Sequence, residues 1–303
     1  MTPKNLSSPF NKYTYIKLSE VSDAISKVLT PIYINGRTSS FSQLSRHLNH
    51  LGMADLTENN RKHFDKVASD HQNDFGELIN TVITELKSRR GWISPKLTDA
   101  PNTDPAASDA VRLLDYACGA GTVSKALAPY ATQTTGLDLS ANMVSEYNKA
   151  TLEMFGSHKA GHARMVGFQH DLLGDSTALP SGTLAPFDII VIGMALHHVA
   201  DAGGLLQRFS ELLKPGGVCV VIDMVPDSAQ LGEGASNLMK EGGVFGTIAK
   251  HGFAEAEMRE LYEGAGMREF DYVVFEQRFR FTLFGEQCSS LGFIARGVKR
   301  GLV

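Results

Sequence analysis

The strongest constraint on the fold is the alternation of short apolar segments with amphipathic segments that begins after residue 110. We expect strands over Val111–Tyr116, Gln133–Asp138, Met165–His170, Phe187–Met194 and Val218–Asp223. Helices are expected between most of them, over Val123–Leu127, Ala141–Met154 and Leu205–Leu213. Several of these strands are almost continuously apolar, which is typical of a parallel sheet covered by helices on both faces. The sequence therefore predicts a doubly wound α/β domain.

The chain after this alternation predicts one more helix and two more strands. The helix is expected over Glu255–Gly264, and strands over Phe270–Phe281 and Gly292–Lys299 follow it. We expect these two strands to form an antiparallel pair at one edge of the sheet. The glycines of Gly216–Gly217 follow the helix that ends near Leu213, and we expect them to cap it.

The first hundred residues predict an extension in front of this domain. Ser94–Ala110 contains prolines among small polar residues, a composition typical of an exposed linker. Before it, apolar residues recur at helical spacing over Leu18–Leu29, over Phe41–Leu51, where Gly52 ends the pattern, and over Phe64–Leu86. We therefore expect a helical N-terminal extension or lid over residues 1–93, a linker over 94–110 and the α/β domain over 111–303. The long connection at 224–253 is expected to be a lid insertion.

The composition excludes several classes of protein. The 303 residues are 43% hydrophobic, enough for a packed core, and the net charge of −4 is unlike the basic field of a general nucleic-acid binder. The longest apolar stretch, Phe187–Val199, is interrupted by polar residues and is too short to span a membrane. Three widely spaced cysteines, with no HExxH motif or clustered carboxylates, predict neither a disulfide framework nor a metal site. The polar start, Met1–Phe10, is unlike a secretory leader, so we expect a cytoplasmic protein.

A glycine-containing loop follows the first strand of the predicted sheet. It reads Asp115-Tyr116-Ala117-Cys118-Gly119-Ala120-Gly121, and its glycines allow a sharp turn and close approach of a ligand to the backbone. Asp138 ends the second strand, where it could accept both hydroxyls of a ribose. Asp171 follows the third strand and could accept from an adenine amino group. Because ligands bind at the carboxyl ends of strands in such sheets, these residues predict one site.

Two kinds of cofactor could use these residues. A dinucleotide site requires G-x-G-x-x-G, but Ser124 stands where the third glycine belongs. Asp115, before the loop, suits an ammonium group better than a pyrophosphate. S-adenosylmethionine combines a ribose, an adenine and a cationic amino acid, and we therefore expect it as the cofactor. On the alternative interpretation the glycines form only a turn, Asp171 caps a turn and Cys118 is a small buried residue.

The chain resembles the class I methyltransferase family in Asp115–Gly121, Gly136–Ser140, Asp171, Phe187–Val199 and Leu212–Asp223. It is nearest to the type 11 and ubiquinone-biosynthesis-like group, which acts on small molecules, and the sequence DYACGAG is similar to fungal members. The resemblance covers roughly Val111–Lys299. It implies a Rossmann-like, seven-stranded sheet whose last strand is antiparallel.

The resemblance also implies which residues bind the cofactor. Asp115 and Gly119 would lie near the methionine moiety, and Asp138 near the ribose. Asp171 and Leu172 would lie near the adenine. Further implied contacts are Ala117, Gly121, Leu139, Met143 and Met194. The family commonly has glycine where Ala117 stands, and alanine is tolerable there if its φ is negative.

The residues after the fourth strand face the site of methyl transfer in this family. Among them His198 is our candidate general base, with a structural, hydrogen-bonding role as the alternative. His197 is expected to be structural or exposed to solvent. Asp223, at the end of the last parallel strand, is either a polar group on the substrate side or part of a turn. His251, in the long connection that follows, is a second catalytic candidate or a substrate contact; on the alternative interpretation it only leads into the helix over Glu255–Gly264.

The N-terminal segment is expected to cover this site. The sequence Phe64-Asp65-Lys66-Val67-Ala68 resembles the start of the family's leading helix, which packs over the cofactor. We therefore expect Phe64–Leu86 to cover the cofactor and Tyr13–Leu51 to line the substrate pocket. The alternative is a tail or an arm that forms a dimer.

These interpretations predict one function and leave two alternatives. We expect an enzyme that transfers a methyl group from S-adenosylmethionine to a small, partly apolar molecule, without a nucleic-acid partner or a membrane span. Both a monomer and a homodimer are compatible with the sequence. One alternative is a protein with the methyltransferase fold that transfers no methyl group and acts as a regulatory partner subunit or catalyses a rearrangement. The other is a nicotinamide oxidoreductase, which Ser124 and Asp115 disfavour.

Overall fold

The computed structural model describes residues 33–34, 37–38, 41–68, 71–156, 158–174, 178–230, 247–283 and 285–301. They belong to two compact units, Met1–Leu51 and Gly52–Val303. In the first unit a short antiparallel pair, β1 (Tyr33–Ile34) and β2 (Arg37–Thr38), precedes helix α2 (Phe41–Val67), which continues into the second unit. The predicted helix over Leu18–Leu29 lies outside the described residues. The same holds for the part of Tyr13–Leu51, the predicted wall of the substrate pocket, that precedes residue 33.

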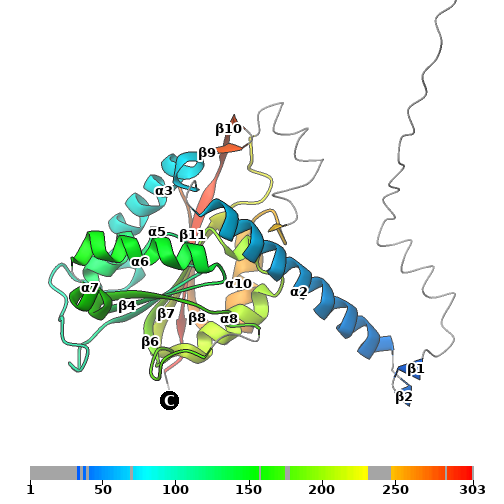
Figure 1. Cartoon of the computed structure of the whole chain (residues 1–303), viewed down its shortest axis with the longest axis horizontal. Coiled ribbons are helices and arrows are strands. Elements are labelled where there is room, and N and C mark those ends of the chain that lie inside the picture. The colour runs from blue at the N-terminus through cyan, green and yellow to red at the C-terminus, as the bar shows by residue number, and fades with distance from the viewer. Residues whose placement is uncertain are drawn as a thin grey trace, which may run out of the picture. The chain divides into compact units, whose positions relative to one another are not determined.

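The second unit is built on a seven-stranded sheet with the strand order β5-β4-β3-β6-β7-β11-β8 (Figure 1). The strands are β3 (Arg112–Tyr116), β4 (Gln133–Asp138), β5 (Met165–Gln169), β6 (Phe187–Gly193), β7 (Leu213–Met224), β8 (Met267–Val274) and β11 (Gly292–Lys299). The strands from β3 to β7 run parallel, and β11 pairs antiparallel with both β7 and β8. The prediction of a doubly wound, Rossmann-like sheet whose last strand is antiparallel is confirmed.

Helices cover both faces of this sheet. They are α3 (His71–Ser88), α4 (Arg90–Ile93), α5 (Thr122–Leu127), α6 (Ala141–Phe155), α7 (His158–Arg164), α8 (Ala202–Leu212) and α10 (Glu255–Gly264). On one face Val191 of β6 shares a buried cluster with Val82 of α3, and on the other Ile192 shares a cluster with Leu205 of α8. Successive side chains of a strand point to opposite faces, so a continuously apolar strand fills both cores. No helix in the described ranges is both long and apolar enough to cross a membrane.

The helices before β3 belong to the α/β unit and not to a separate extension. Leu86 of α3, Ile93 of α4 and Leu97 are buried in the same cluster as the strands. The predicted division at residues 94–110 is therefore corrected, because the compact unit begins at Gly52. The apolar stripe of α3 fills the core on one face of the sheet.

Asp188, on β6, ties the start of the predicted linker to the sheet. Its buried carboxylate accepts hydrogen bonds from Lys96 Nζ and Lys214 Nζ, each at 2.6 Å, and from Arg112 N at 2.9 Å. Burial acts to raise the pKa of Asp188, but these donors outweigh it and the pKa is lowered. The beginning of the predicted linker is thus fixed against the domain.

Three predicted helix boundaries differ from the structure. The helix predicted to stop at Gly52 continues through it as α2, at the modest cost that glycine brings to a helix. The predicted helix over Phe64–Leu86 is divided between α2 and α3. Gly216 has a φ of +76° but lies within β7, so it does not cap α8. Instead Leu213 takes an extended conformation directly after α8 and leads the chain into the strand.

The strand predicted over Phe270–Phe281 is also two strands. After β8, the chain leaves the sheet, and β9 (Phe279–Leu283) pairs with β10 (Glu286–Ser290) in a separate antiparallel hairpin. Phe275 and Phe279 are buried between the strands with their ring centroids 5.6 Å apart. The two residues are four positions apart and so keep the alternation of a single strand, but the ladder with β11 ends at Val274 and Phe279 pairs with Ser290 of β10.

Candidate active site

The loop between β3 and α5 needs a left-handed backbone at three positions. Gly119 has a φ of +49°, Gly121 of +87° and Ala117 of +52°. The turn closes through a 2.8 Å hydrogen bond from Gly121 N to Cys118 O. The condition under which alanine fits easily in place of the family's glycine is therefore not met at Ala117. A left-handed conformation costs a residue with a Cβ about 1–2 kcal/mol, so this loop is strained.

The two glycines of the loop have different surroundings. A Cβ built on Gly119 would meet no atom within 4 Å, so the loop borders open space at this residue. A Cβ on Gly121 would lie 3.3 Å from the ring of Tyr147, so this glycine permits close packing against α6. Gly119 is thus the position where a ligand could approach the backbone and where a side chain would obstruct it.

Asp138 ends β4, and two backbone donors fix its carboxylate. Oδ2 accepts from Gly119 N at 2.8 Å, and Oδ1 accepts from Ser140 N at 2.9 Å. Loss of solvation raises the pKa of Asp138 to about 6, and the nearby carboxylate of Asp65 adds to the effect. The residue as a whole is half-buried. Since each carboxylate oxygen has a second lone pair, Asp138 can also accept hydrogen bonds from hydroxyl groups of a ligand.

Asp115 lies beneath the loop. It is 1% exposed, and its Oδ2 accepts from Ser124 N at 3.1 Å and from Ser124 Oγ at 2.7 Å. Ser124 Oγ also lies 2.7 Å from the hydroxyl of Tyr147. Burial raises the pKa of Asp115 to about 8. These contacts give Asp115 a role in fixing the start of α5, and its contact with a methionine moiety stays a prediction.

Asp171 and Leu172 follow β5 in a turn that contacts the end of β3. Asp171 Oδ1 accepts from the hydroxyl of Tyr116 at 3.2 Å and from Leu173 N at 2.9 Å. Leu172 N donates to the same Tyr116 hydroxyl at 3.4 Å. The bond to Leu173 N is that of a turn capped by its own aspartate, as the alternative interpretation has it. The adenine contacts of Asp171 and Leu172 stay predictions.

The other predicted cofactor contacts lie beside the same strand ends. Leu139 follows β4 directly. Met143 is buried, and its N–H donates to Ser140 Oγ at 3.0 Å, which caps α6. Met194 follows β6 with a φ of +56°, and its N–H donates to Ile222 O at 2.8 Å. The structure therefore brings these residues to the carboxyl ends of β4 and β6.

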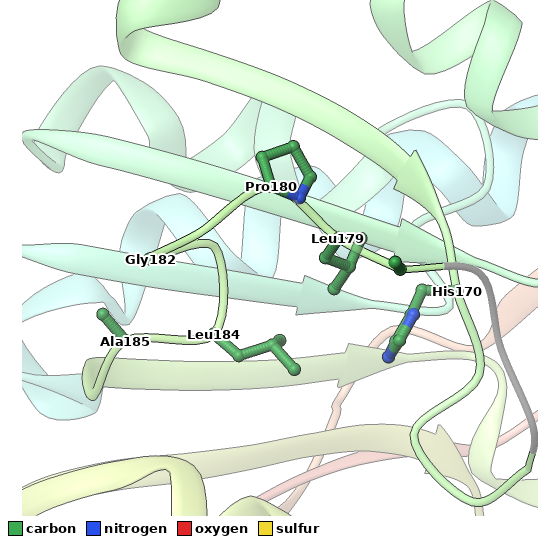
Figure 2. Close-up of a pocket in the computed structure, with 7 residues that line it drawn as sticks. His170, Leu179, Pro180, Gly182, Leu184 and Ala185 are labelled. Atoms are coloured by element: carbon green, nitrogen blue, oxygen red, sulfur yellow. The ribbon is translucent and has the colours of Figure 1, made fainter.

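An open hollow of about 550 Å³ adjoins the turn after β5. Its lining is His170, Ala178, Leu179, Pro180, Gly182, Leu184 and Ala185 (Figure 2). His170 is the one titratable side chain in this lining, and most of the other residues are apolar. The hollow thus lies beside the segment for which the adenine contact is predicted.

The two histidines after β6 have different environments. His197 is buried, its Nδ1 lies 2.8 Å from Asp223 Oδ1, and its backbone N–H donates to Asp223 Oδ2 at 3.1 Å, so the pair ties the turn after β6 to the end of β7. His198 is half-buried, and its Nδ1 lies 2.7 Å from Thr247 O. A carbonyl oxygen only accepts hydrogen bonds, so Nδ1 of His198 carries a proton. In the neutral ring Nε2 is then the basic nitrogen.

His251 follows a segment that is bonded to the same turn. Ala249 N and Lys250 N donate to His197 O at 2.9 and 3.1 Å. The side chain of His251 is exposed. The structure brings the backbone before His251 to the end of β6 but leaves its imidazole at the surface, and a catalytic role for it stays a prediction.

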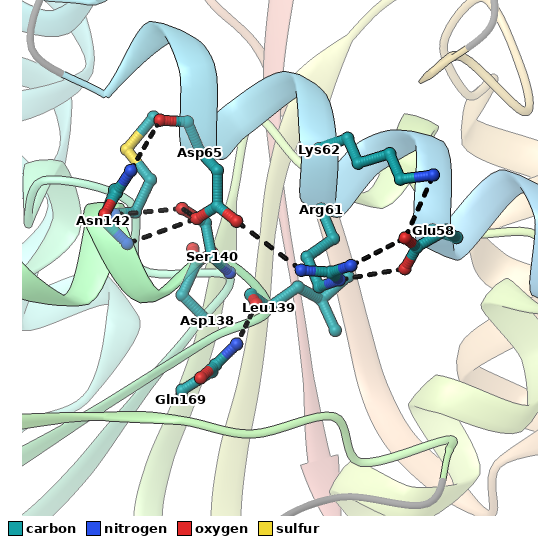
Figure 3. A network of polar contacts seen from close by, with 10 residues as sticks. Glu58, Arg61, Lys62, Asp65, Asp138, Leu139, Ser140, Asn142 and Gln169 are labelled. Carbon is teal, nitrogen blue, oxygen red and sulfur yellow. Dashed lines mark hydrogen bonds and ion pairs between the residues drawn. The ribbon is translucent and has the colours of Figure 1, made fainter.

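The Glu58–Val67 segment of α2 contacts the ends of two strands. Asp65 Oδ1 accepts from Ser140 Oγ at 2.6 Å and from Asn142 N at 3.2 Å, beside β4 (Figure 3). Asn60 Nδ2 donates to His198 O at 3.0 Å, beside β6. The sequence predicted that a helix beginning at Phe64 covers the site. In the structure the contacts come from the end of the preceding helix, α2, through Asn60 and Asp65.

Asn60 was not predicted as a site residue. No motif marks it, and its contact depends on how α2 packs against a turn 138 residues further along the chain. The resemblance of Phe64–Ala68 to the family's leading helix was the one sequence signal that pointed to this helix.

The remaining reactive side chains near the loop form no further catalytic group. Cys118 is buried, and burial raises the pKa of its thiol well above the ordinary value. An uncharged, enclosed thiol is a poor nucleophile. Within the described part of the chain, no three His, Cys, Asp or Glu side chains are arranged to hold a metal ion.

Comparison with known proteins identifies the domain that contains these residues. Residues 114–219 match the family model described as a methyltransferase domain. They form a class I methyltransferase domain. Methyltransferases of this family use S-adenosylmethionine as the methyl donor. The matched part of the methyltransferase domain includes the glycine loop, Asp138, Asp171 and His198, but neither His251 nor the Glu58–Val67 segment.

The methyltransferase domain has named relatives. An uncharacterized methyltransferase of Schizosaccharomyces pombe is 36% identical over 113 residues, which are 37% of this chain and 38% of the relative. A ubiquinone/menaquinone biosynthesis C-methyltransferase of Desulfotalea psychrophila is 30% identical over 174 residues, 56% of this chain and 60% of the relative. A solved structure of an S-adenosylmethionine-dependent methyltransferase from Thermotoga maritima aligns with 79% of this chain and 99% of that chain, at a TM-score of 0.49 and 16% identity. The chain spans between 38% and 60% of the length of the curated relatives it matches.

Proposed function

We propose that the protein is an enzyme that transfers a methyl group from S-adenosylmethionine to a small, partly apolar molecule. The observation that supports this most strongly is the position of Asp138. Its carboxylate is fixed by Gly119 N and Ser140 N at the end of β4, beside the open face of the loop. A half-buried acceptor in this position suits the two hydroxyls of a ribose.

The residues around Asp138 fit this cofactor. The open space at Gly119 would admit the methionine moiety close to the backbone, and the turn at Asp171 and Leu172 would meet the adenine. The cofactor supplies an activated methyl group on a sulfonium. A dinucleotide is less well supported, because the place of the third glycine is filled by Ser124, whose hydroxyl is bonded to Asp115 beneath the loop.

We also propose His198 as the general base. Thr247 O fixes Nδ1–H, so Nε2 would take the proton that the acceptor group loses as it is methylated. The same carbonyl would then stabilise the imidazolium that forms. Relatives named as O-methyltransferases and C-methyltransferases of ubiquinone biosynthesis support a small, partly apolar substrate for this chain.

The experiment that tests the proposal uses the full chain and S-adenosylmethionine labelled in its methyl group. Incubation with a small-molecule extract should yield labelled products that are one methyl group heavier than their precursors, together with S-adenosylhomocysteine. A reaction with Asp138→Ala is the control for background labelling. Binding of S-adenosylhomocysteine without any labelled product would instead favour the alternative that transfers no methyl group.

A further inference from the structure

We propose that Asn60 is a positioning residue, which ties helix α2 to the turn that contains His198 and thereby fixes the direction of the His198 imidazole. The inference rests on the proposed role of His198 as a base. It adds to the site a residue that lies outside the matched methyltransferase region.

Helix α2 holds both the backbone and the ring of His198. Asn60 is 4% exposed, and its Nδ2 donates to the backbone oxygen of His198 at 3.0 Å. One helical turn later, on the same face of α2, the ring of Phe64 meets the imidazole edge-on, with centroids 5.2 Å apart and an interplanar angle of 84°. Thr247 O bonds Nδ1 of the same ring. The imidazole is thus oriented by contacts from two separate segments.

The same segment of α2 is anchored on the cofactor side. Asp65 Oδ1 accepts from Ser140 Oγ at 2.6 Å, while Ser140 N donates to Asp138 (Figure 3). The other oxygen of Asp65 lies 3.7 Å from the guanidinium of Arg61. One continuous helix therefore contacts a neighbour of Asp138 and the backbone of His198. It can set the position of the base relative to the cofactor.

The hydrogen bonds of Asn60 argue against a purely stabilising role. Its Oδ1 is buried and has no hydrogen-bond partner within the described part of the chain. Leaving a buried acceptor unsatisfied costs at least as much as one hydrogen bond contributes. The bond from Nδ2 and the unsatisfied Oδ1 therefore nearly cancel, and an apolar residue of similar size should be tolerated. The specific contribution of asparagine is its hydrogen bond to the backbone oxygen of His198.

The variant Asn60→Leu separates the two roles, because leucine keeps the branched shape of asparagine and removes both the donor and the unsatisfied acceptor. We expect the Tm of the full chain to change little, because one unsatisfied acceptor (Asn60 Oδ1) is exchanged for another (His198 O). The kcat should fall about tenfold to a hundredfold, as for a misplaced reacting group. KM and the affinity for S-adenosylhomocysteine should change by no more than about twofold. Asn59→Leu is the matched control, since Asn59 is the next residue on the same helix and is exposed. It should change neither Tm nor kcat.

A second measurement does not depend on activity. Nitrogen NMR of the imidazole should show His198 of the wild type protonated at Nδ1 when neutral, and Asn60→Leu should move its signals towards a mixture of tautomers. Asn60→Asp, which cannot donate when ionised, should show the same shift at neutral pH. Unchanged His198 signals, or a loss of kcat that parallels a fall in Tm, would overturn the inference. Failure of the wild type to bind S-adenosylhomocysteine would instead overturn the proposed function.

Discussion

Ala117→Gly should stabilise the protein, although glycine usually destabilises. Ala117 has a φ of +52°, a conformation that costs a residue with a Cβ about 1–2 kcal/mol. Glycine avoids this cost but loses about 0.5–1 kcal/mol in backbone entropy. The balance predicts an increase of roughly 0.5–1 kcal/mol in the free energy of unfolding.

Urea unfolding followed by circular dichroism measures this difference. The midpoint should rise while the slope with denaturant stays constant, because both proteins expose the same surface on unfolding. Ala256→Gly is the matched control: Ala256 is exposed, lies within helix α10 and has no positive φ. Since no left-handed strain is relieved there, that variant should lose about 0.5–1 kcal/mol.

The reasoning is refuted if Ala117→Gly loses as much stability as Ala256→Gly. That result would mean that Ala117 does not hold a left-handed conformation in solution, and the geometry of the loop would have to be revised.

Three further predictions concern the site. Burial raises the pKa of Asp115 from 3.8 to about 8, so the protonated form of this residue favours the folded state. As the pH rises from 4 to 8, the free energy of unfolding of the wild type should therefore fall relative to that of Asp115→Asn. Equal pH profiles of the two proteins in urea titrations would contradict this. Gly119→Ala should abolish binding of S-adenosylhomocysteine in calorimetry. Gly216 also has a positive φ and open space where a Cβ would lie, so Gly216→Ala should lose similar stability but bind normally. Normal binding by both variants would show that the loop is only a turn. His198→Ala should lower kcat about 10²–10⁴-fold without weakening cofactor binding, and the exposed His162→Ala should leave kcat unchanged; if His251→Ala shows the loss instead, the base lies in the segment after β7.

The fold could be predicted because its signals are local. Strand β6 and the second half of β7 are buried on both faces and are almost uninterrupted runs of apolar residues, and all the strands from β3 to β7 end close to the predicted positions. The packing partner of a helix is not a local property. The stripe on α3 predicted burial, but nothing in it told that Leu86 would pack on the sheet and not over the strand ends. Phe275 and Phe279 likewise looked like members of one strand, because a break in register leaves no mark in an apolar pattern.

The site was predictable where chemistry and chain position coincide. Asp138 could be predicted as a site residue because it places a carboxylate at the end of a strand. The burial of Asp115 beneath the loop depends on the partner Ser124, which sequence reasoning treated only as a missing glycine. Asn60 could not be predicted, because its hydrogen bond to His198 exists only once α2 and β6 have packed in the fold.

Calorimetric titration of the wild type and of Asp138→Ala with S-adenosylhomocysteine tests the central claim most directly. If the carboxylate held by Gly119 N and Ser140 N accepts two ribose hydroxyls, the variant should bind more weakly by about 2–3 kcal/mol. The wild type should show no comparable binding of NAD. Equal affinity of the two proteins for S-adenosylhomocysteine, or tight binding of NAD by the wild type, would contradict the account.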